Sequence, residues 1–537
     1  MNEKKLIFLL VLLFAVLMSL PWLVPGTGWL ALFGLVPLLC AERIATSCRI
    51  KRFWLIHYLA FVLWNTFTTF WIWNATAGGA VFAILVNAAQ MSLIFGLFRI
   101  SRRRFSGALP YIFLMVMWIA WERFYFSAEI SWPWLTLGNA FAITTKLAQW
   151  YSVTGTLGGS LWIWGSNLVI FGLMCAFSEG SWWTMHYKAQ FASLIGSVIL
   201  LGGPVAASLI IYDRYEEKSE SSAKVVVGQP NIDIYHKFRS MSQAEQTETL
   251  LTLFSEAGDS VSLFVAPETF TSDVVLNEMD SSATVRAFSD FLESRPGADM
   301  LFGASTWEII RKRAQPSLLA RPYGNGWIES HNSAILLDGK GNSELYHKSK
   351  LVVGVEKTPF PAIFTKIDDR LGGVMGRCVP QERISCLHLK DGTAFGSPIC
   401  YESVYGEYCT GYVREGAEFL AVITNDAWWG DTPGYRQHLS YSRLRAIELR
   451  RDIARSANTG ISAFINQKGD IVSCTEWWQP AILEGEVKFN SELTPFAKYG
   501  DIVGRVCTLT FLLMLLALIV RTMSGGFRPA SASRARR

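Results

Sequence analysis

The chain has 537 residues, more than one ordinary domain requires, and 51% of them are hydrophobic while only 17% are charged. This composition is too apolar for an ordinary soluble protein and predicts a membrane protein. The formal net charge of +5 would suit a nucleic-acid-binding protein, but the basic residues lie beside apolar stretches rather than in one patch, so nucleic acid is not expected as a partner.

Apolar runs long enough to cross roughly 30 Å of hydrocarbon predict about eight membrane-spanning helices. They begin near Leu6, Leu30, Phe53, Ala80, Leu109, Leu161, Phe191 and Val506. We expect the first run to be retained, because the segment that follows it, 24–28, lacks the small residues of a signal-peptide cleavage site. The pattern predicts seven helices in 1–221, a polar domain in 222–490, a linker and last helix in 491–523, and a basic tail in 524–537.

The basic residues of the short loops predict the orientation in the membrane, because Lys and Arg resist translocation. With a cytoplasmic N-terminus, one side collects Lys4, Lys5, Arg43, Arg49, Lys51, Arg52, Arg99, Arg102, Arg103, Arg104, Arg521, Arg528, Arg534, Arg536 and Arg537. The alternate loops are nearly free of charge. Both termini are therefore expected in the cytoplasm and the polar domain on the outer side.

The outer segment 128–158 is aromatic without being a clean span, and it contains Trp132, Trp134 and Trp150. Aromatic side chains gather at membrane interfaces. Two interpretations remain open for this segment. It is either a pair of poorly defined helix ends with an aromatic belt, or an arm that faces the substrate.

Strands and helices alternate in the polar domain, which predicts an α/β fold. The expected elements are strands at 225–227, 263–266 and 419–424, a helix opened by the capping box of Ser242 and Glu245, further helices near 283–293 and 438–454, and a hairpin of 333–337 with 343–346. Four arginines on the last of these helices are expected to form a solvated or ion-paired face: Arg443, Arg445, Arg450 and Arg451.

Three predicted strand ends carry chemically active side chains. Glu268 follows the strand 263–266, Lys348 follows the second hairpin strand, and Cys400 follows Gly396–Ile399. Groups at the carboxyl ends of strands in an α/β fold converge on one crevice. A carboxylate can deprotonate a thiol, the thiolate can attack a carbonyl carbon, and an ammonium can stabilise the resulting oxyanion. Singly, each residue has an ordinary interpretation as a buried thiol or a solvated charge, so the hypothesis depends on their occurring together.

Pro267-Glu268, Tyr346-His347-Lys348 and Ile399-Cys400-Tyr401-Glu402 resemble the Glu-Lys-Cys motifs of the nitrilase superfamily. The membrane helices and the segment Thr424–Gly430 are similar to the apolipoprotein N-acyltransferases within that superfamily. This resemblance implies an αββα sandwich as the fold of the polar domain, beside the polytopic α-helical membrane domain.

The resemblance also implies roles for individual residues. Glu268 would be the general base, Lys348 the oxyanion-stabilising cation and Cys400 the acylated nucleophile. Glu356, Tyr401 and Glu402 would support this triad. Phe238, Trp428 and Trp429 would contact substrate, with Phe238 replacing a tryptophan that is usual in the family. His347 and Lys350 also depart from the family pattern and could change the local charge or the substrate preference. Trp428 and Trp429 could instead be core aromatics, and Glu402 a carboxylate that caps a helix start.

The implied reaction moves an acyl chain from a glycerophospholipid, with phosphatidylethanolamine the expected donor, through a Cys400 thioester. The acceptor would be the α-amine of a diacylglyceryl-cysteine at the N-terminus of a lipoprotein. This implies a monomeric enzyme without a cofactor in a bacterial cytoplasmic membrane, with a periplasmic catalytic domain. No metal site is expected, because the nine cysteines lack paired ligand spacing. Two alternatives remain: a membrane-bound amidase in which water resolves the thioester, and a transporter or scaffold with an inactive domain of this fold.

Overall fold

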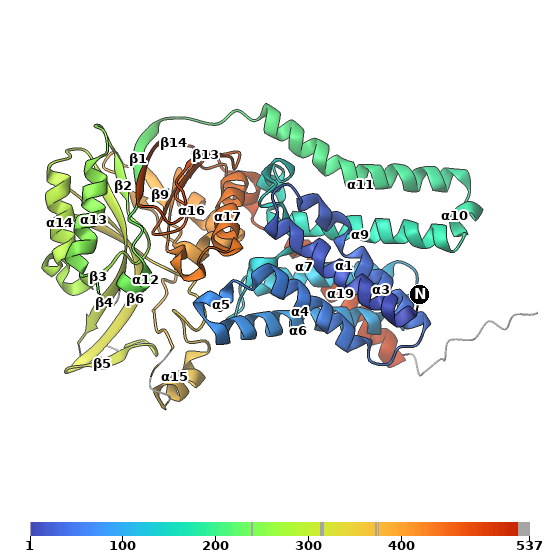
Figure 1. Ribbon diagram of the computed structural model, residues 1–537. Coiled ribbons are helices and arrows are strands. Elements are labelled where there is room, and N and C mark those ends of the chain that lie inside the picture. Colours follow the sequence, from blue (N-terminus) through green and yellow to red (C-terminus); the bar gives the residue numbers. More distant parts are fainter. Residues whose placement is uncertain (1, 238–239, 312–315, 371–372, 374, 525–537) are drawn as a thin grey trace, which may run out of the picture.

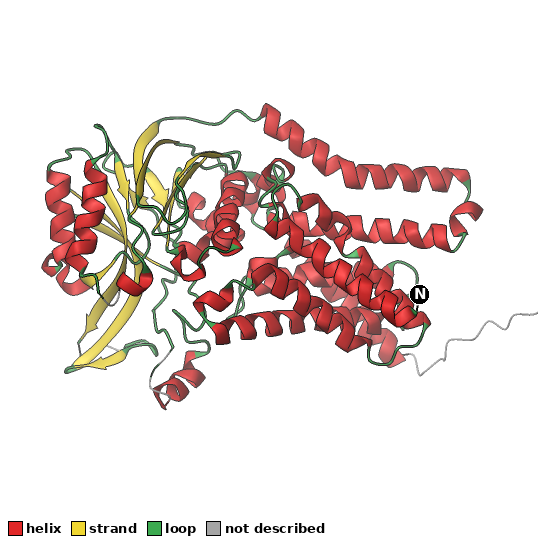
Figure 2. Ribbon diagram, viewed as in Figure 1, coloured by secondary structure: helices red, strands yellow, loops and turns green. Residues whose placement is uncertain are grey.

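The structure is a computed structural model that describes residues 2–237, 240–311, 316–370, 373 and 375–524. A bundle of long helices joins a domain built on two β-sheets (Figure 1). The α-helices of the bundle run roughly side by side, whereas the strands of the described residues lie in the second domain (Figure 2).

Each of the eight predicted spans coincides with a helical segment. The long helices are α1 (Glu3–Leu23), α3 (Val36–Ser47), α4 (Phe53–Thr69), α6 (Ala77–Ser101), α7 (Leu109–Tyr125), α9 (Thr156–Ser178), α11 (Tyr187–Arg214) and α19 (Ile502–Ser524). Within the described residues, six helical segments are long and apolar enough to cross a membrane, one of them joining the short elements η1 (Gly28–Leu30) and α2 (Ala31–Gly34) to α3. The other two predicted spans, α4 and α7, have 17 residues each and so are each about 26 Å long.

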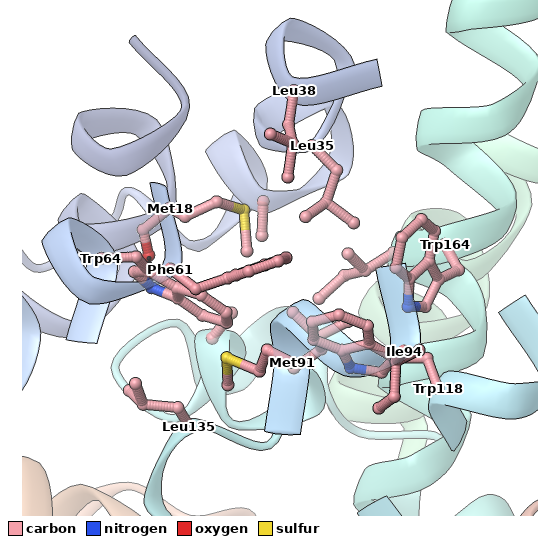
Figure 3. Packing of buried hydrophobic residues seen from close by; sticks show 14 of the residues in the cluster. Met18, Leu35, Leu38, Phe61, Trp64, Met91, Ile94, Trp118, Leu135 and Trp164 are labelled. Atoms are coloured by element: carbon pink, nitrogen blue, oxygen red, sulfur yellow. Dashed lines mark hydrogen bonds between the residues drawn. The ribbon is translucent and has the colours of Figure 1, made fainter. Parts of the chain in front are cut away.

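Aromatic side chains fill the centre of the bundle. Phe61 on α4 lies 5.7 Å from Trp118 on α7, and Trp118 lies 5.4 Å from Trp164 on α9, as measured between ring centroids. Figure 3 shows these rings directed toward one another from separate helices, with Met18 and Met91 beside them. Their packing brings distant parts of the first 170 residues into one core.

The second domain contains two sheets. The first runs in the order β14 (Ala481–Lys488), β1 (Ser222–Gln229), β2 (Leu263–Val265), β4 (Asp299–Ile310), β6 (Gly326–Asp338) and β5 (Arg321–Tyr323), with β3 (Thr271–Val275) beside β4 and β7 (Ser343–His347) beside β6. The second runs in the order β13 (Ile471–Cys474), β12 (Ala463–Ile465), β11 (Ile453–Ala457), β10 (Phe419–Thr424), β9 (Ala394–Gly396) and β8 (Leu387–His388). Helices α13 (Gln243–Ser255) and α14 (Ala283–Glu293) lie beside the first sheet, and α16 (Gly406–Arg414) and α17 (Pro433–Leu449) beside the second (Figure 1).

The alternation of side chains along β1 explains why the first sheet is covered on both faces. Val225 and Val227 belong to the core between the two sheets, whereas Val226 belongs to the core shared with Leu250 and Phe254 of α13. Successive side chains of a strand point to opposite faces, so a continuous valine run buries both faces of this strand. The predicted αββα sandwich is therefore confirmed, as are the capping box at Ser242 and the hairpin of β6 with β7.

Two expectations for the segment around α17 were wrong in part. The helix ends at Leu449 rather than near residue 454, because Ile453 and Ala454 pair with β10 as strand β11. The arginines expected to form a solvated or ion-paired face are not solvated at Arg445 and Arg451, which are each only 1% exposed, whereas Arg445 is ion-paired with Glu448.

Those arginines connect α17 to its neighbours. Arg445 forms an ion pair with Glu448 at 2.8 Å, and it donates hydrogen bonds to the carbonyl oxygens of residues 403 and 404. Arg450 donates to the carbonyl oxygens of Gln149 and Gln467. Backbone carbonyl oxygens therefore take the place of water as hydrogen-bond acceptors for these buried guanidinium groups, and a buried cation needs such acceptors.

Helix α17 and the segment 128–150 join the two domains. Gln437 on α17 accepts hydrogen bonds from Trp71 at 3.2 Å and from Trp134 at 2.7 Å, and the Tyr441 hydroxyl accepts one from Trp22 at 3.2 Å. The segment contains the short 3-10 helices η2 (Pro133–Leu135), η3 (Leu137–Phe141) and η4 (Thr145–Leu147). It is largely buried and forms short 3-10 helices rather than a pair of helix ends.

Candidate active site

The three predicted strand ends meet in one place. Lys348 follows β7, and its Nζ lies 2.8 Å from Oε1 of Glu268, which follows β2. The same Nζ lies 2.9 Å from Oε1 of Glu356. Lys348 is 1% exposed and Glu268 5%, so the ion pairs are largely shielded from water. Cys400 lies within electrostatic range of both Glu268 and Lys348.

Two asparagines orient the carboxylates. Asn332 Nδ2 donates to Oε1 of Glu268 at 2.8 Å and to Oε1 of Glu356 at 2.7 Å. The backbone N–H of Asn425 donates to Oε2 of Glu268 at 3.1 Å. Sequence reasoning missed Asn332, since nothing in a single sequence distinguishes it from other polar residues of the β6 strand. Each oxygen of Glu268 therefore has a fixed donor, which restrains the carboxylate in one orientation.

The backbone turns sharply at two of the strand ends. Cys400 has φ +49° and Thr269, immediately after Glu268, has φ +45°. Non-glycine residues rarely adopt this left-handed region, and such strain gathers at functional sites. Gly303 allows the turn after Glu268, because a Cβ at this position would lie 2.5 Å from the Glu268 Cα. These turns direct the Glu268 and Cys400 segments into the same crevice.

The charges of the site shift two pKa values. Burial by itself lowers the pKa of Lys348, but the Glu268 and Glu356 carboxylates outweigh it and hold this pKa well above its usual range. Burial raises the pKa of the Cys400 thiol well above its usual value; Glu268 raises it further, and Lys348 opposes both. The resting site therefore combines an ammonium and a protonated thiol. The thiol needs a base before it can act as a nucleophile.

Glu402 links the segments that carry Lys348 and Cys400 by hydrogen bonds. It is fully buried, and its Oε2 accepts a hydrogen bond from the Ile399 N–H at 2.8 Å. Its Oε1 accepts from the Ser349 N–H at 2.7 Å. The cap expected at a helix start is present in the turn η6 (Cys400–Val404), and the same carboxylate also connects this turn to the residue that follows Lys348.

Tyr401 connects the nucleophile segment to the membrane domain. Its hydroxyl donates to the Ser131 carbonyl oxygen at 3.0 Å, and its ring is stacked on Trp132 at 6.0 Å between centroids. The aromatic segment 128–150 is therefore part of the surroundings of Cys400.

A histidine that sequence reasoning did not single out holds the Cys400 backbone. His438 Nε2 donates to the Cys400 carbonyl oxygen at 3.0 Å, and His438 Nδ1 lies 2.9 Å from Oδ1 of Asp426. Arg455 pairs with the other Asp426 oxygen at 2.8 Å. Cys400, Asp426 and His438 bring potential metal-ligand atoms within 4.8 Å of one another. The Arg455 guanidinium already neutralises Asp426, so this cluster is better explained as support for the strained turn at Cys400.

The two tryptophans differ in their environments. Trp428 is 43% exposed, whereas Trp429 lies 4.8 Å from Trp71 and 5.8 Å from Trp134 between ring centroids. Trp429 thus packs in the junction between the domains, as its interpretation as a core aromatic expected, and Trp428 is available to a ligand. Phe238 lies outside the residues that the structure describes.

The residues near Lys348 that depart from the family pattern have distinct effects. Burial lowers the pKa of His347 to about 3, so this imidazole is neutral at physiological pH and adds no charge. Lys350 instead lies over the Tyr405 and Tyr408 rings, with Nζ 5.3 and 5.5 Å from their centroids. Sequence reasoning missed another lysine, Lys237. Burial lowers the pKa of Lys237 to about 8, although Glu268 acts to raise it.

A cavity of about 270 Å³ opens beside the carboxylates. Asn332 and Glu356 contribute to its wall, together with Thr269, Arg321 and Arg377. The cavity provides space for a polar group next to the Lys348 ion pairs.

Known proteins resemble the chain over both domains. Residues 224–492 match the carbon-nitrogen hydrolase family model, and residues 14–169 match the model of the apolipoprotein N-acyltransferase N-terminal domain. The apolipoprotein N-acyltransferase of Chlorobaculum tepidum is 27% identical over 498 residues, covering 89% of each chain. That of Geobacter metallireducens is 26% identical over 517 residues, covering 93% of each chain. Among solved structures, Nit3 of Saccharomyces cerevisiae, a member of branch 10 of the nitrilase superfamily, is 15% identical with a TM-score of 0.37, covering 53% of this chain and 98% of its own.

The family assignment rests on the first of these matches, which begins within β1 and ends just after β14 and so contains the whole sandwich. Because the carbon-nitrogen hydrolase model extends over half of the sequence, the chain belongs to the carbon-nitrogen hydrolase family.

Proposed function

We propose that the chain is an apolipoprotein N-acyltransferase that uses Glu268, Lys348 and Cys400 as its catalytic set. The observation that carries the proposal is the position of this set directly beside the membrane domain. Tyr401, the residue after the nucleophile, is stacked on Trp132 of the junction segment. A site for two lipid substrates must lie at the bilayer surface, and the named relatives match along nearly the full chain.

In the first half-reaction Glu268 takes the thiol proton of Cys400, and the sulfur attacks an ester carbonyl carbon of a glycerophospholipid. The C–S bond forms while Lys348 stabilises the oxyanion. The C–O bond then breaks, and Glu268 returns the proton to the leaving alkoxide. The products are a Cys400 thioester and a lysophospholipid.

In the second half-reaction the α-amine of a diacylglyceryl-cysteine attacks the thioester carbonyl. The C–N bond forms and the C–S bond breaks. Glu268 passes the proton from the amine to the departing sulfur of Cys400, which restores the enzyme. Glu356 would keep Lys348 charged in both steps, because it lies 2.9 Å from the ammonium. Trp428 would line the path of the acyl chain.

We also propose a multi-pass location in a bacterial cytoplasmic membrane with the catalytic domain in the periplasm. The basic loops lie at the ends of α3 and α6 that are remote from the sandwich (Figure 1). Because basic loops stay on the cytoplasmic side, this arrangement favours an external sandwich.

Intact-protein mass spectrometry after incubation with phosphatidylethanolamine tests the proposed function. The wild type should gain the mass of one acyl chain and pass it to a diacylated lipopeptide. Cys400→Ala should do neither, whereas Cys474→Ala, which removes an exposed cysteine, should behave like the wild type. Acyl transfer by Cys400→Ala would refute the triad. An acyl-enzyme that releases only free fatty acid would instead support the hydrolase alternative.

A further inference from the structure

A large cavity lies in the membrane domain, away from the catalytic domain. Its volume is about 950 Å³, and α3, α4 and α6 contribute most of its lining. It includes residues 49–51, just before α4, and residues 99–103 around the end of α6. Figure 1 shows these helix ends on the far side of the bundle from the sandwich. The cavity is therefore separate from the site of Cys400.

The polar end of the cavity is strongly basic. Five basic residues contribute to its lining: Arg49, Lys51, Arg99, Arg102 and Arg103. The one acidic residue of the lining, Glu42, is buried and pairs with Arg102 and, at 3.3 Å, with Arg99. Within the described part of the chain, the other three cations have no ion-pair partner. The polar end thus keeps an excess of positive charge that an anion would balance.

The rest of the lining includes apolar side chains that are exposed. Trp54 is 57% exposed, Leu93 65% and Ile100 54%, and all three contribute to the lining. Side chains of this kind on a membrane helix suit contact with hydrocarbon. A ligand that fits both parts of the cavity needs an anionic head and an apolar tail.

A buried imidazole also contributes to the lining. His57 is 2% exposed and lines the cavity, and its Nδ1 is 2.8 Å from the Ser92 hydroxyl oxygen. Its Nε2 has no hydrogen-bond partner among the residues that the structure describes.

We propose that the cavity binds an anionic phospholipid of the leaflet opposite the catalytic domain. Its phosphate and headgroup lie among Arg49, Lys51 and Arg103, and one acyl chain follows Trp54 and Leu93. Basic pockets between membrane helices are suited to anionic lipid headgroups. This lipid is distinct from the acyl donor, because it lies at the end of the bundle remote from Cys400.

Native mass spectrometry of the delipidated full-length protein in detergent tests the proposal. Phosphatidylglycerol, phosphatidylethanolamine and inorganic phosphate are titrated separately. We expect the wild type to retain phosphatidylglycerol in preference to phosphatidylethanolamine and not to retain inorganic phosphate. The Lys51→Gln/Arg103→Gln variant should bind phosphatidylglycerol about 30-fold more weakly, because two charges near the phosphate are lost. The matched Lys4→Gln/Lys5→Gln variant removes the same charge outside the lining and should bind like the wild type.

Acyl transfer to a lipopeptide, measured on the same two variants, should remain at the wild-type level. Equal weakening in both variants would overturn the proposal, because it would indicate attraction to the basic face as a whole. Binding without preference for the anionic lipid, or retention of inorganic phosphate in its place, would also overturn it. Loss of acyl transfer in a folded Lys51→Gln/Arg103→Gln variant would contradict a site distinct from that of the acyl donor.

Discussion

Replacing Glu402 by glutamine tests whether this buried carboxylate holds the nucleophile and the oxyanion-stabilising lysine together. Oε2 accepts a hydrogen bond from the Ile399 N–H at 2.8 Å, while Oε1 accepts from the N–H groups of Ser349 at 2.7 Å and Lys350 at 3.2 Å. In either orientation, the amide nitrogen of glutamine would face at least one of these backbone donors. One buried N–H group would therefore lose its acceptor.

The expected loss of stability follows from this geometry. A hydrogen bond to a charged group contributes about 1.5–3 kcal/mol, and an unpaired buried donor costs about 1–3 kcal/mol more. We expect Glu402→Gln to lower the free energy of unfolding by about 3 kcal/mol and the melting temperature by roughly 5–10 °C. Acyl transfer should fall by at least about tenfold, because the relative positions of Lys348 and Cys400 would be less restrained.

Thermal unfolding in detergent and the lipopeptide assay measure both effects. Glu415→Gln is the matched control, because it makes the same change at an exposed carboxylate in the same domain. A Glu402→Gln protein with the wild-type melting temperature and rate would refute the anchoring role. Loss of stability with an unchanged rate per folded enzyme would show that Glu402 acts on folding alone.

Two further predictions concern charge and aromatic packing. Glu268 raises the pKa of the Cys400 thiol and Lys348 lowers it. The pH profile of alkylation by iodoacetamide should therefore shift to lower pH in Glu268→Gln and to higher pH in Lys348→Met. Shifts of both variants in the same direction would contradict the electrostatic assignment. Trp429→Ala should lower stability by about 3 kcal/mol, since it removes a ring packed between the domains. Trp428→Ala, at an exposed residue, should leave the melting temperature unchanged and raise KM for the phospholipid. Loss of stability in Trp428→Ala together with a raised KM in Trp429→Ala would show that Trp428 is the packing residue and Trp429 the substrate contact.

Much of the architecture could be predicted from local patterns. Apolar runs located the eight long helices of the bundle, and the strand Phe419–Thr424 has the predicted bounds. The three strand ends at Glu268, Lys348 and Cys400 do meet, as expected for parallel strand ends in an α/β fold. These features depend on hydrophobic periodicity and chain direction, which a sequence carries within short segments.

Other features arose only from contacts between distant segments. The arginines in and just after α17 look like a solvated or ion-paired face in the sequence, but Arg445 and Arg451 are buried against backbone oxygens far along the chain. Asn332 is an ordinary polar residue until β6 brings it between Glu268 and Glu356.

The sequence by itself determined the membrane spans, the alternation of strands and helices in the polar domain and the residue types of the reactive set, because each depends on local pattern. Only the tertiary structure decided which side chains position them: Asn332 between the carboxylates, His438 behind the Cys400 carbonyl, and Glu402 across two strand ends. It also decided that Trp132 lies beside Tyr401. The physical reason is that a hydrogen bond or ring contact depends on the distance between atoms in space. For partners from 24 to 270 residues apart, no local pattern encodes that distance.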